Sequence, residues 1–206
     1  MWSEYPMTLR KTLIACLMLL FVASTVKAGE EYQIDRSHSR IGFAVKHMLV
    51  TTVRGNFKEF NVTINYDADD ITKSSVNANI VTASVDTDNE RRDNHLRSDD
   101  FFNAEKFPEI VFVSKKIVKN GDGHILVGDL TIRDITKEVE MPFEITDVLT
   151  SDRGNRFGFS ARLTINRMDY GVRWDRTMDT GGLIAGEEVT IEIDGAAVQR
   201  KEKSSN

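Results

Sequence analysis

The stretch Phe157-Gly-Phe-Ser-Ala-Arg-Leu-Thr-Ile165 decides the fold, because every second residue along it is apolar. Successive side chains of a strand point to opposite faces, so this spacing predicts a strand with one apolar face. The stretch Val139-Glu-Met-Pro-Phe-Glu-Ile145 repeats the pattern and sets glutamates opposite the apolar stripe. Proline cannot donate a backbone hydrogen bond, so Pro142 indicates an edge position or a bulge.

The same alternation extends through the rest of the chain and predicts about eight antiparallel strands in total. Two turn sequences separate strands: Asn120-Gly121-Asp122-Gly123 and Asp152-Arg153-Gly154-Asn155. The Asn-Gly pair favours the positive φ angles that tight hairpins require. The remaining alternating stretches are Ile41–Val45, Phe60–Tyr66, Val76–Ile80, Ile110–Phe112, Leu126–Ile132 and Val189–Ile193.

These strands predict an all-β domain with a minor helical part. A segment over residues 86–108, charged and then aromatic, interrupts the strand pattern. We expect one or two short helices there, with Asp88 as a helix cap. Eight antiparallel strands form either a sandwich or an up-and-down barrel, and the alternation alone fits both.

Composition and charge exclude several classes of protein. The 206 residues carry a net charge of −5, which argues against a nucleic-acid partner. The single cysteine, Cys16, excludes an internal disulfide and a cysteine-based metal cluster. Neutral, apolar or anionic small ligands stay open.

Residues 1–28 have the pattern of a cleaved signal peptide. Arg10 and Lys11 precede the apolar run Leu13–Ala23, and small residues lead up to Ala28. The apolar run is shorter than the roughly 20 residues of a spanning helix. We therefore expect export to the periplasm or secretion, one domain over residues 29–199, and a polar tail over residues 200–206.

Motifs for metal binding and catalysis are weak. The four histidines, His38, His47, His95 and His124, have no spacing that predicts a shared metal ion. The acidic run Asp67–Asp70 lacks the glycine and the terminal glutamate of a calcium loop. We predict no metal site and no catalytic residue. One alternative is an exported, stress-related hydrolase that uses His38 or His95.

Two groups of cationic and aromatic residues could surround the mouth of a barrel. Such side chains could present hydrogen-bond donors to the headgroup of a ligand. The alternative is a solvated helix, in which the arginines pair with neighbouring aspartates. The candidate headgroup residues are Arg92, His95 and Arg97 in the first group and Tyr170, Arg173 and Trp174 in the second.

Four blocks in order along the chain resemble the YceI-like family, and together they span nearly all of residues 29–199. They are Asp35-Arg36-Ser37-His38-Ser39 with Ile41-Gly42-Phe43 and His47; Arg92–Ser98 with Phe101-Phe102 and Lys106-Phe107-Pro108; Gly128–Ile132 with Thr136-Lys137; and Ile165–Gly171.

This resemblance implies an eight-stranded antiparallel lipocalin-like barrel around an apolar tunnel. It also implies a long-chain ligand, such as a polyisoprenoid, an isoprenoid quinone or a fatty amide, in a periplasmic carrier that is not an enzyme. It supplies no catalytic residue and no cofactor beyond the bound lipid. It allows a homodimer and transient contact with a membrane or a membrane protein.

The apolar stripes then become the expected wall of a ligand cavity. A barrel lined by such side chains would bury a hydrocarbon chain without directional chemistry. A third alternative is an interaction module whose interior is filled by its own side chains. The predicted cavity residues are Ile41, Phe43, Val45, Val62, Ile64, Ile80, Phe112, Leu130, Ile132, Phe143, Phe159 and Leu163.

Overall fold

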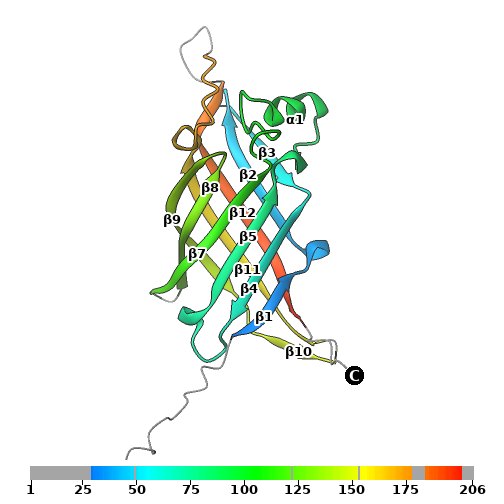
Figure 1. The fold of residues 1–206 in the computed structure, drawn as a ribbon, viewed down its shortest axis with the longest axis vertical. Coiled ribbons are helices and arrows are strands. Elements are labelled where there is room, and N and C mark those ends of the chain that lie inside the picture. Colours follow the sequence, from blue (N-terminus) through cyan, green and yellow to red (C-terminus); the bar gives the residue numbers. More distant parts are fainter. Residues whose placement is uncertain (1–28, 49, 122, 153, 178–183, 201–206) are drawn as a thin grey trace, which may run out of the picture.

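The computed structural model describes residues 29–48, 50–121, 123–152, 154–177 and 184–200 (Figure 1). The expected signal peptide, with Cys16, lies outside the described residues and stays a prediction. Of the expected tail, Arg200 is described. Its backbone N–H donates to the Glu31 carbonyl at 2.8 Å, and its guanidinium bonds the Glu31 carboxylate.

The fold is a closed antiparallel barrel of eight long strands, which confirms the predicted fold class. The ring runs β11-β9-β8-β7-β5-β4-β1-β12 and closes through the pairing of β12 with β11. Barrel closure removes the exposed edges that an open sheet would leave. The strands of the ring are β1 (Glu30–Ile34), β4 (Phe60–Tyr66), β5 (Ser75–Val81), β7 (Glu109–Asn120), β8 (Gly123–Ile132), β9 (Ile135–Ile145), β11 (Gly154–Asn166) and β12 (Ala185–Gln199).

Three strands of this ring continue beyond a kink. A 3-10 turn, η1 (Arg36–His38), separates β1 from β2 (Arg40–His47), and η3 (Thr82–Ser84) separates β5 from β6 (Val85–Asp86). Between them, β3 (Thr51–Phe57) runs into β4. Two hydrogen bonds connect the three kinks. The Lys58 N–H donates to the Ser84 carbonyl, and the Arg36 side chain donates to the Lys58 carbonyl.

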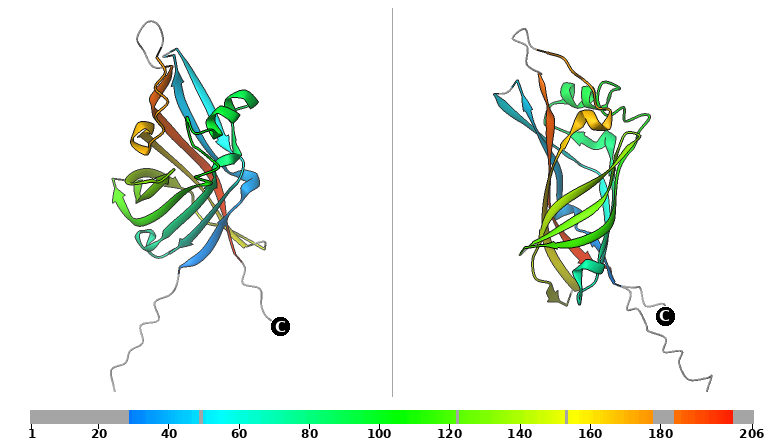
Figure 2. Two further views of the ribbon diagram at one scale, coloured as in Figure 1. Left: turned by 45° about the horizontal axis from the view of Figure 1, so that its top comes forward. Right: turned by 90° about the vertical axis from the view of Figure 1, so that its left-hand side faces the viewer.

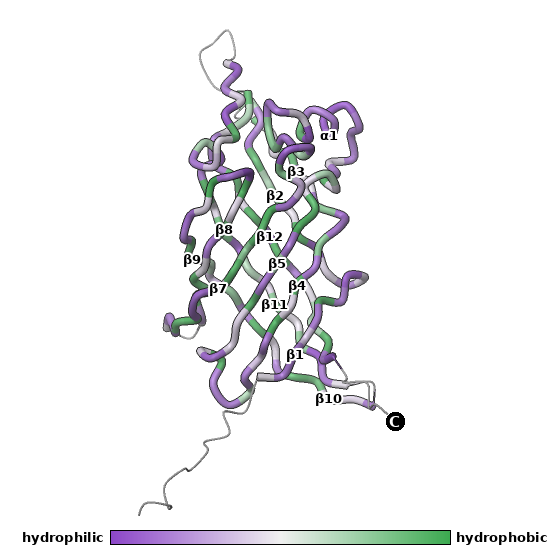
Figure 3. Tube along the Cα trace, viewed as in Figure 1, coloured by the Kyte–Doolittle hydropathy of each residue, from purple (hydrophilic) through white to green (hydrophobic). Residues whose placement is uncertain are grey.

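Both predicted hairpins are present. Asn120 pairs with Gly123 across the turn between β7 and β8, and Gly121 has a φ of +57°. Gly154 pairs with Ser151 of the short strand β10 (Leu149–Ser151). The hydropathy colouring in Figure 3 shows apolar and polar positions interspersed along the strands, as expected for a sheet with an apolar inner face.

One α-helix, α1 (Glu90–Arg97), lies beside β3 at the upper end of the barrel (Figures 1 and 2). The predicted cap is wrong by one residue: Asn89 caps the helix, and its side chain accepts from the Arg92 N–H at 3.0 Å. Asp88 instead takes a left-handed conformation with a φ of +57°. Within the described ranges, no helix is long and apolar enough to span a membrane.

Another 3-10 turn, η4 (Arg167–Tyr170), follows β11 and leads into the chain that returns to β12. The Asn166 side chain accepts from the Met168 N–H, and Gly171 ends the turn in the left-handed conformation. This geometry places η4 over the same end of the barrel as α1.

Candidate ligand cavity

The barrel encloses a cavity of about 240 Å³. Every long strand of the ring contributes apolar side chains to its wall, and few polar residues reach it. All twelve predicted cavity residues lie on this wall, so the predicted face of each strand is the inner one. Their contact with a ligand stays a prediction. These residues are Ile41, Phe43, Val45, Val62, Ile64, Ile80, Phe112, Leu130, Ile132, Phe143, Phe159 and Leu163.

An aromatic cluster packs at the lower end of the barrel. The ring of Tyr32 lies 5.8 Å from that of Tyr66 and 4.9 Å from that of Phe157, measured between centroids. Tyr66 and Phe157 also contact each other, at 5.1 Å. The Tyr32 hydroxyl donates to Glu30 at 3.3 Å, and burial raises the pKa of Tyr32. The three rings therefore fill this end with apolar surface.

The segment around α1 and the described chain after η4 lie at the upper end of the barrel (Figure 1). Phe101 and Phe102 follow the helix and line the cavity. Trp174 lies 5.4 Å from the Phe101 ring, and the His95 ring stands edge-on to both. The His95 Nε2 atom is 2.8 Å from Asp100, so the polar edge of the imidazole turns to a carboxylate.

Two of the predicted headgroup residues hold the helix in place. Arg92 donates to the hydroxyl and the carbonyl of Thr87, each at 2.7 Å. Arg97 donates to the carbonyls of Ala83 and Val85 at 2.7 and 2.8 Å. These bonds direct both guanidinium groups to backbone and hydroxyl oxygens near the helix, and neither arginine lines the cavity.

The three residues of the second predicted headgroup group lie in different environments. Tyr170 lines the cavity and is 2% exposed, and burial raises its pKa to about 12. Trp174 packs on Phe101, whereas Arg173 is exposed. Headgroup binding by these six residues stays a prediction, and Tyr170 is the one among them that reaches the cavity wall.

Arg167 is a buried residue of the site that the sequence analysis did not single out. Its guanidinium donates to the carbonyls of Val172, Trp174, Ala185 and Gly186 at 2.7 to 3.0 Å. Burial lowers its pKa. The arginine thus ties η4 to the start of β12. In the sequence, the signal for such a residue is a cation placed directly after the apolar stripe of β11, which ends at Ile165.

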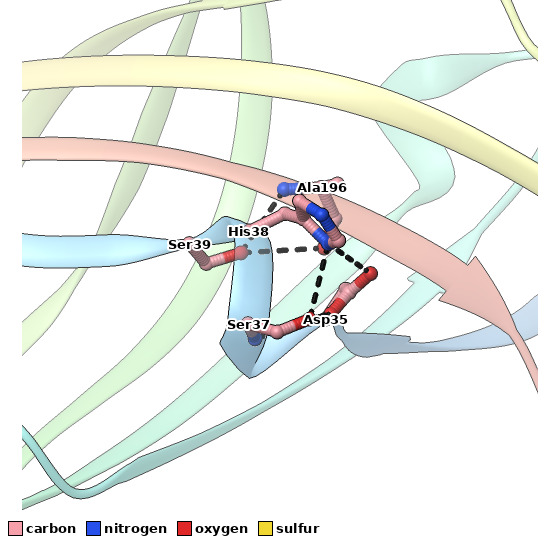
Figure 4. A network of polar contacts seen from close by, with 5 residues as sticks. All are labelled: Asp35, Ser37, His38, Ser39 and Ala196. Carbon is pink, nitrogen blue, oxygen red and sulfur yellow. Dashed lines mark hydrogen bonds and ion pairs between the residues drawn. The ribbon is translucent and has the colours of Figure 1, made fainter.

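The motif behind the hydrolase alternative forms a compact polar network outside the cavity (Figure 4). The Ser37 hydroxyl donates to Asp35 at 2.6 Å, and the His38 Nδ1 atom lies 2.9 Å from Asp35 and 3.0 Å from Ser37. A catalytic triad needs the acid and the serine on different ring nitrogens. Here both contact Nδ1, so the geometry is that of a turn cap.

No three histidine, cysteine or carboxylate side chains of the described residues converge as metal ligands would. In the acidic run, the Asp67 carboxylate instead accepts the backbone N–H groups of Asp69 and Asp70 at 3.0 and 2.9 Å. The Asp70 carboxylate caps η2 (Ile71–Lys73) by accepting from Thr72. These carboxylates therefore act as acceptors within a turn.

A closed antiparallel barrel around an apolar cavity defines a class of small-ligand binding architectures. Within that class, this chain belongs to the YceI-like family, whose domain matches residues 32–197. A UPF0312 protein of Staphylococcus epidermidis is 39% identical over 164 residues, covering 79% of this chain and 94% of that protein.

Solved structures show the same fold. The YCEI protein of Campylobacter jejuni superposes with a TM-score of 0.65 at 31% identity, covering 76% of this chain and 90% of that one. A polyisoprenoid binding domain from Saccharophagus degradans, implicated in plant cell wall breakdown, superposes with a TM-score of 0.63 at 12% identity, covering 82% and 98%.

Proposed function

We propose that this protein binds a long apolar chain in its barrel cavity and carries or stores it in the periplasm without catalysing a reaction. The ligand class is a polyisoprenoid, an isoprenoid quinone or a fatty amide. The observation that carries the proposal is the wall of the cavity, to which all long strands contribute apolar side chains. The polyisoprenoid binding domain of Saccharophagus degradans supports the same ligand class.

Physical chemistry favours a chain over a compact polar ligand. Each Å² of apolar surface removed from water contributes about 25 cal/mol, so a long hydrocarbon gains most from enclosure. The cavity also weakens the alternative of an interaction module, because that alternative needs an interior filled by side chains.

Organic-solvent extraction of the protein purified from its own cells, followed by mass spectrometry, tests the proposal. We expect a lipid with a long unbranched or isoprenoid chain in stoichiometric amount. A second measurement follows the uptake of cis-parinaric acid, a fluorescent long-chain polyene, by the delipidated protein. Extracts without lipid, together with no uptake of the probe or of a prenyl chain, would refute the proposal.

The proposed location rests on the signal-peptide pattern. Mass spectrometry of the protein from a periplasmic fraction should give a chain that begins at Gly29. A chain that retains Met1 or Met7 and stays in the cytoplasm would contradict export. Exchange of lipid would involve transient contact with a membrane or membrane protein, and sedimentation of the loaded protein would show whether it acts as a homodimer.

A further inference from the structure

The ladder between β9 and β11 is short for strands of 11 and 13 residues. These strands pair at three positions, which end at Phe143 and Ala161. By contrast, β11 pairs with β12 at eleven positions and β9 pairs with β8 at nine. β1 also pairs with β12 at three positions, but there β2 continues the pairing along β12. Pro142, which has no backbone N–H, stands at the first position beyond the short ladder. It thus has no ladder partner on the side of β11, although it pairs with Ile125 of β8 on the other side.

The far end of this unpaired region is closed by η4. The Lys137 ammonium of β9 lies 3.1 Å from the Asp169 carboxylate of η4, which follows directly after β11. The wall therefore has a slot, bounded by the pair Phe143–Ala161 at one end and the pair Lys137–Asp169 at the other. Its sides are residues 138–142 of β9 and residues 162–166 of β11, all described.

The two faces of the slot differ in chemistry. The side chains of Val139 and Met141 on β9 and of Leu163 and Ile165 on β11 line the cavity. Glu140 and Thr164, in contrast, are exposed on the outside. The unpaired stretch thus has polar side chains on its outer face and apolar side chains on its inner face.

Aromatic rings pack against one another at both ends of the barrel. Tyr32, Tyr66 and Phe157 form the cluster at one end. Phe101 and Trp174 are in contact at the other. Opening an end would separate packed rings, whereas widening the slot breaks no ladder hydrogen bond between β9 and β11.

We propose that the slot between β9 and β11 is a lateral portal, through which an extended apolar chain passes into and out of the cavity. This proposal rests on the proposed function, since it assigns a route to the same ligand. The portal suits a flexible chain that can thread sideways between two strands, and its charged outer rim lies in water while the chain passes.

A cross-link across the slot tests the portal. In the Cys16→Ala background, Glu140→Cys and Thr164→Cys place thiols on its two sides, because the ladder register continued past Phe143–Ala161 sets these positions opposite each other. A short bis-maleimide then ties the strands together. Stopped-flow fluorescence measures association and dissociation of cis-parinaric acid. We expect both rates to fall by about tenfold or more, with little change in affinity, because the link raises the barrier to passage.

The matched control uses the same threonine on a fully paired ladder. The hydroxyls of Thr164 and Thr190 lie 3.2 Å apart across β11 and β12, so Thr164→Cys with Thr190→Cys takes the same reagent without spanning the slot. We expect its rates to equal those of the unlinked protein. Equal rates for the slot-linked protein would overturn the portal and leave the proposed function intact. Failure of the unmodified protein to bind any chain would instead overturn the proposed function.

Discussion

The Asp35 carboxylate and the His38 imidazole, 2.9 Å apart, lock the turn that separates β1 from β2. Asp35 also accepts the backbone N–H and the hydroxyl of Ser37, and these bonds to Ser37 and then to His38 lower the pKa of Asp35 to about 2. The network thus stabilises the kink from which β2 leaves the line of β1.

Substitution of Asp35 by Ala should therefore lower the free energy of unfolding at pH 7 by about 1 kcal/mol, the usual cost of losing a side-chain cap. Because the folded pKa is depressed, the carboxylate stabilises the fold fully above its unfolded pKa and loses this effect as pH falls toward 2. Urea unfolding of the unmodified protein and of the Asp35→Ala variant at pH 7 and at pH 2.5 (about half a unit above the folded pKa) checks this. The difference in unfolding free energy between the two proteins should shrink at pH 2.5, and a difference that grows on acidification would contradict the prediction.

Thr82 and Thr87 are two buried threonines with opposite hydrogen bonding. The Thr82 hydroxyl has no partner among the described residues, whereas that of Thr87 donates to Asp93 and accepts from Arg92. Thr82→Val should leave stability unchanged or raise it by about 1 kcal/mol, since it removes an unsatisfied group. Thr87→Val should cost about 1 to 3 kcal/mol, because it orphans charged partners. Thermal unfolding of both variants measures the two changes in stability. Equal losses of stability would contradict the opposite hydrogen bonding of the two hydroxyls.

The alternation of residues predicts eight of the strands and the inward face of each, but not β1, which belongs to the ring, nor β3, β6 and β10. All twelve predicted cavity residues fall on the cavity wall because strand parity is a local property. The family resemblance, and not the alternation, predicts closure into a barrel. Closure depends on the pairing of β11 with β12, and the alternation within a strand does not specify which strands pair. The strand β3 was missed because Thr51-Thr52-Val53-Arg54 shows no alternation.

The polar parts of the site were less predictable for a related reason. The side chains of Arg92 and Arg97 turn to backbone carbonyls that lie five to fourteen residues away. Likewise, the carboxylate partner of His38 is Asp35, three residues earlier in the same turn. Such contacts depend on how turns fold back, and composition near the residue does not specify them.

Among the arginines that hold the upper end of the barrel together, Arg167 should be the one whose substitution lowers the free energy of unfolding most. Replacing it by Met leaves four carbonyls without their donor, and a bond to a charged group is worth about 1.5 to 3 kcal/mol. We therefore expect a loss of at least about 3 kcal/mol in unfolding free energy. Lysine should rescue little, because an ammonium lacks the planar fork of the guanidinium.

The control for this prediction is Arg162→Met on the outer face of β11. Arg162 is exposed and bonds Glu192 at 3.2 Å, so its removal should cost no more than about 1 kcal/mol. Chemical denaturation of the three variants measures the difference. A comparable loss for both methionine variants would show that Arg167 does not hold η4 to β12 as the contacts indicate.

Ala78 tests the cavity itself without touching the slot or either end. It is 9% exposed on β5 and lines the cavity, so Ala78→Phe should fill space that a ligand chain needs. We expect the affinity for cis-parinaric acid to fall by about tenfold or more, with a stability change within the 1 to 3 kcal/mol range of overpacked sites. Val113→Phe places the same ring on the outside of β7, where Val113 is 46% exposed, and should leave binding unchanged. If the two variants bound the probe equally well, the chain would not lie in the barrel interior.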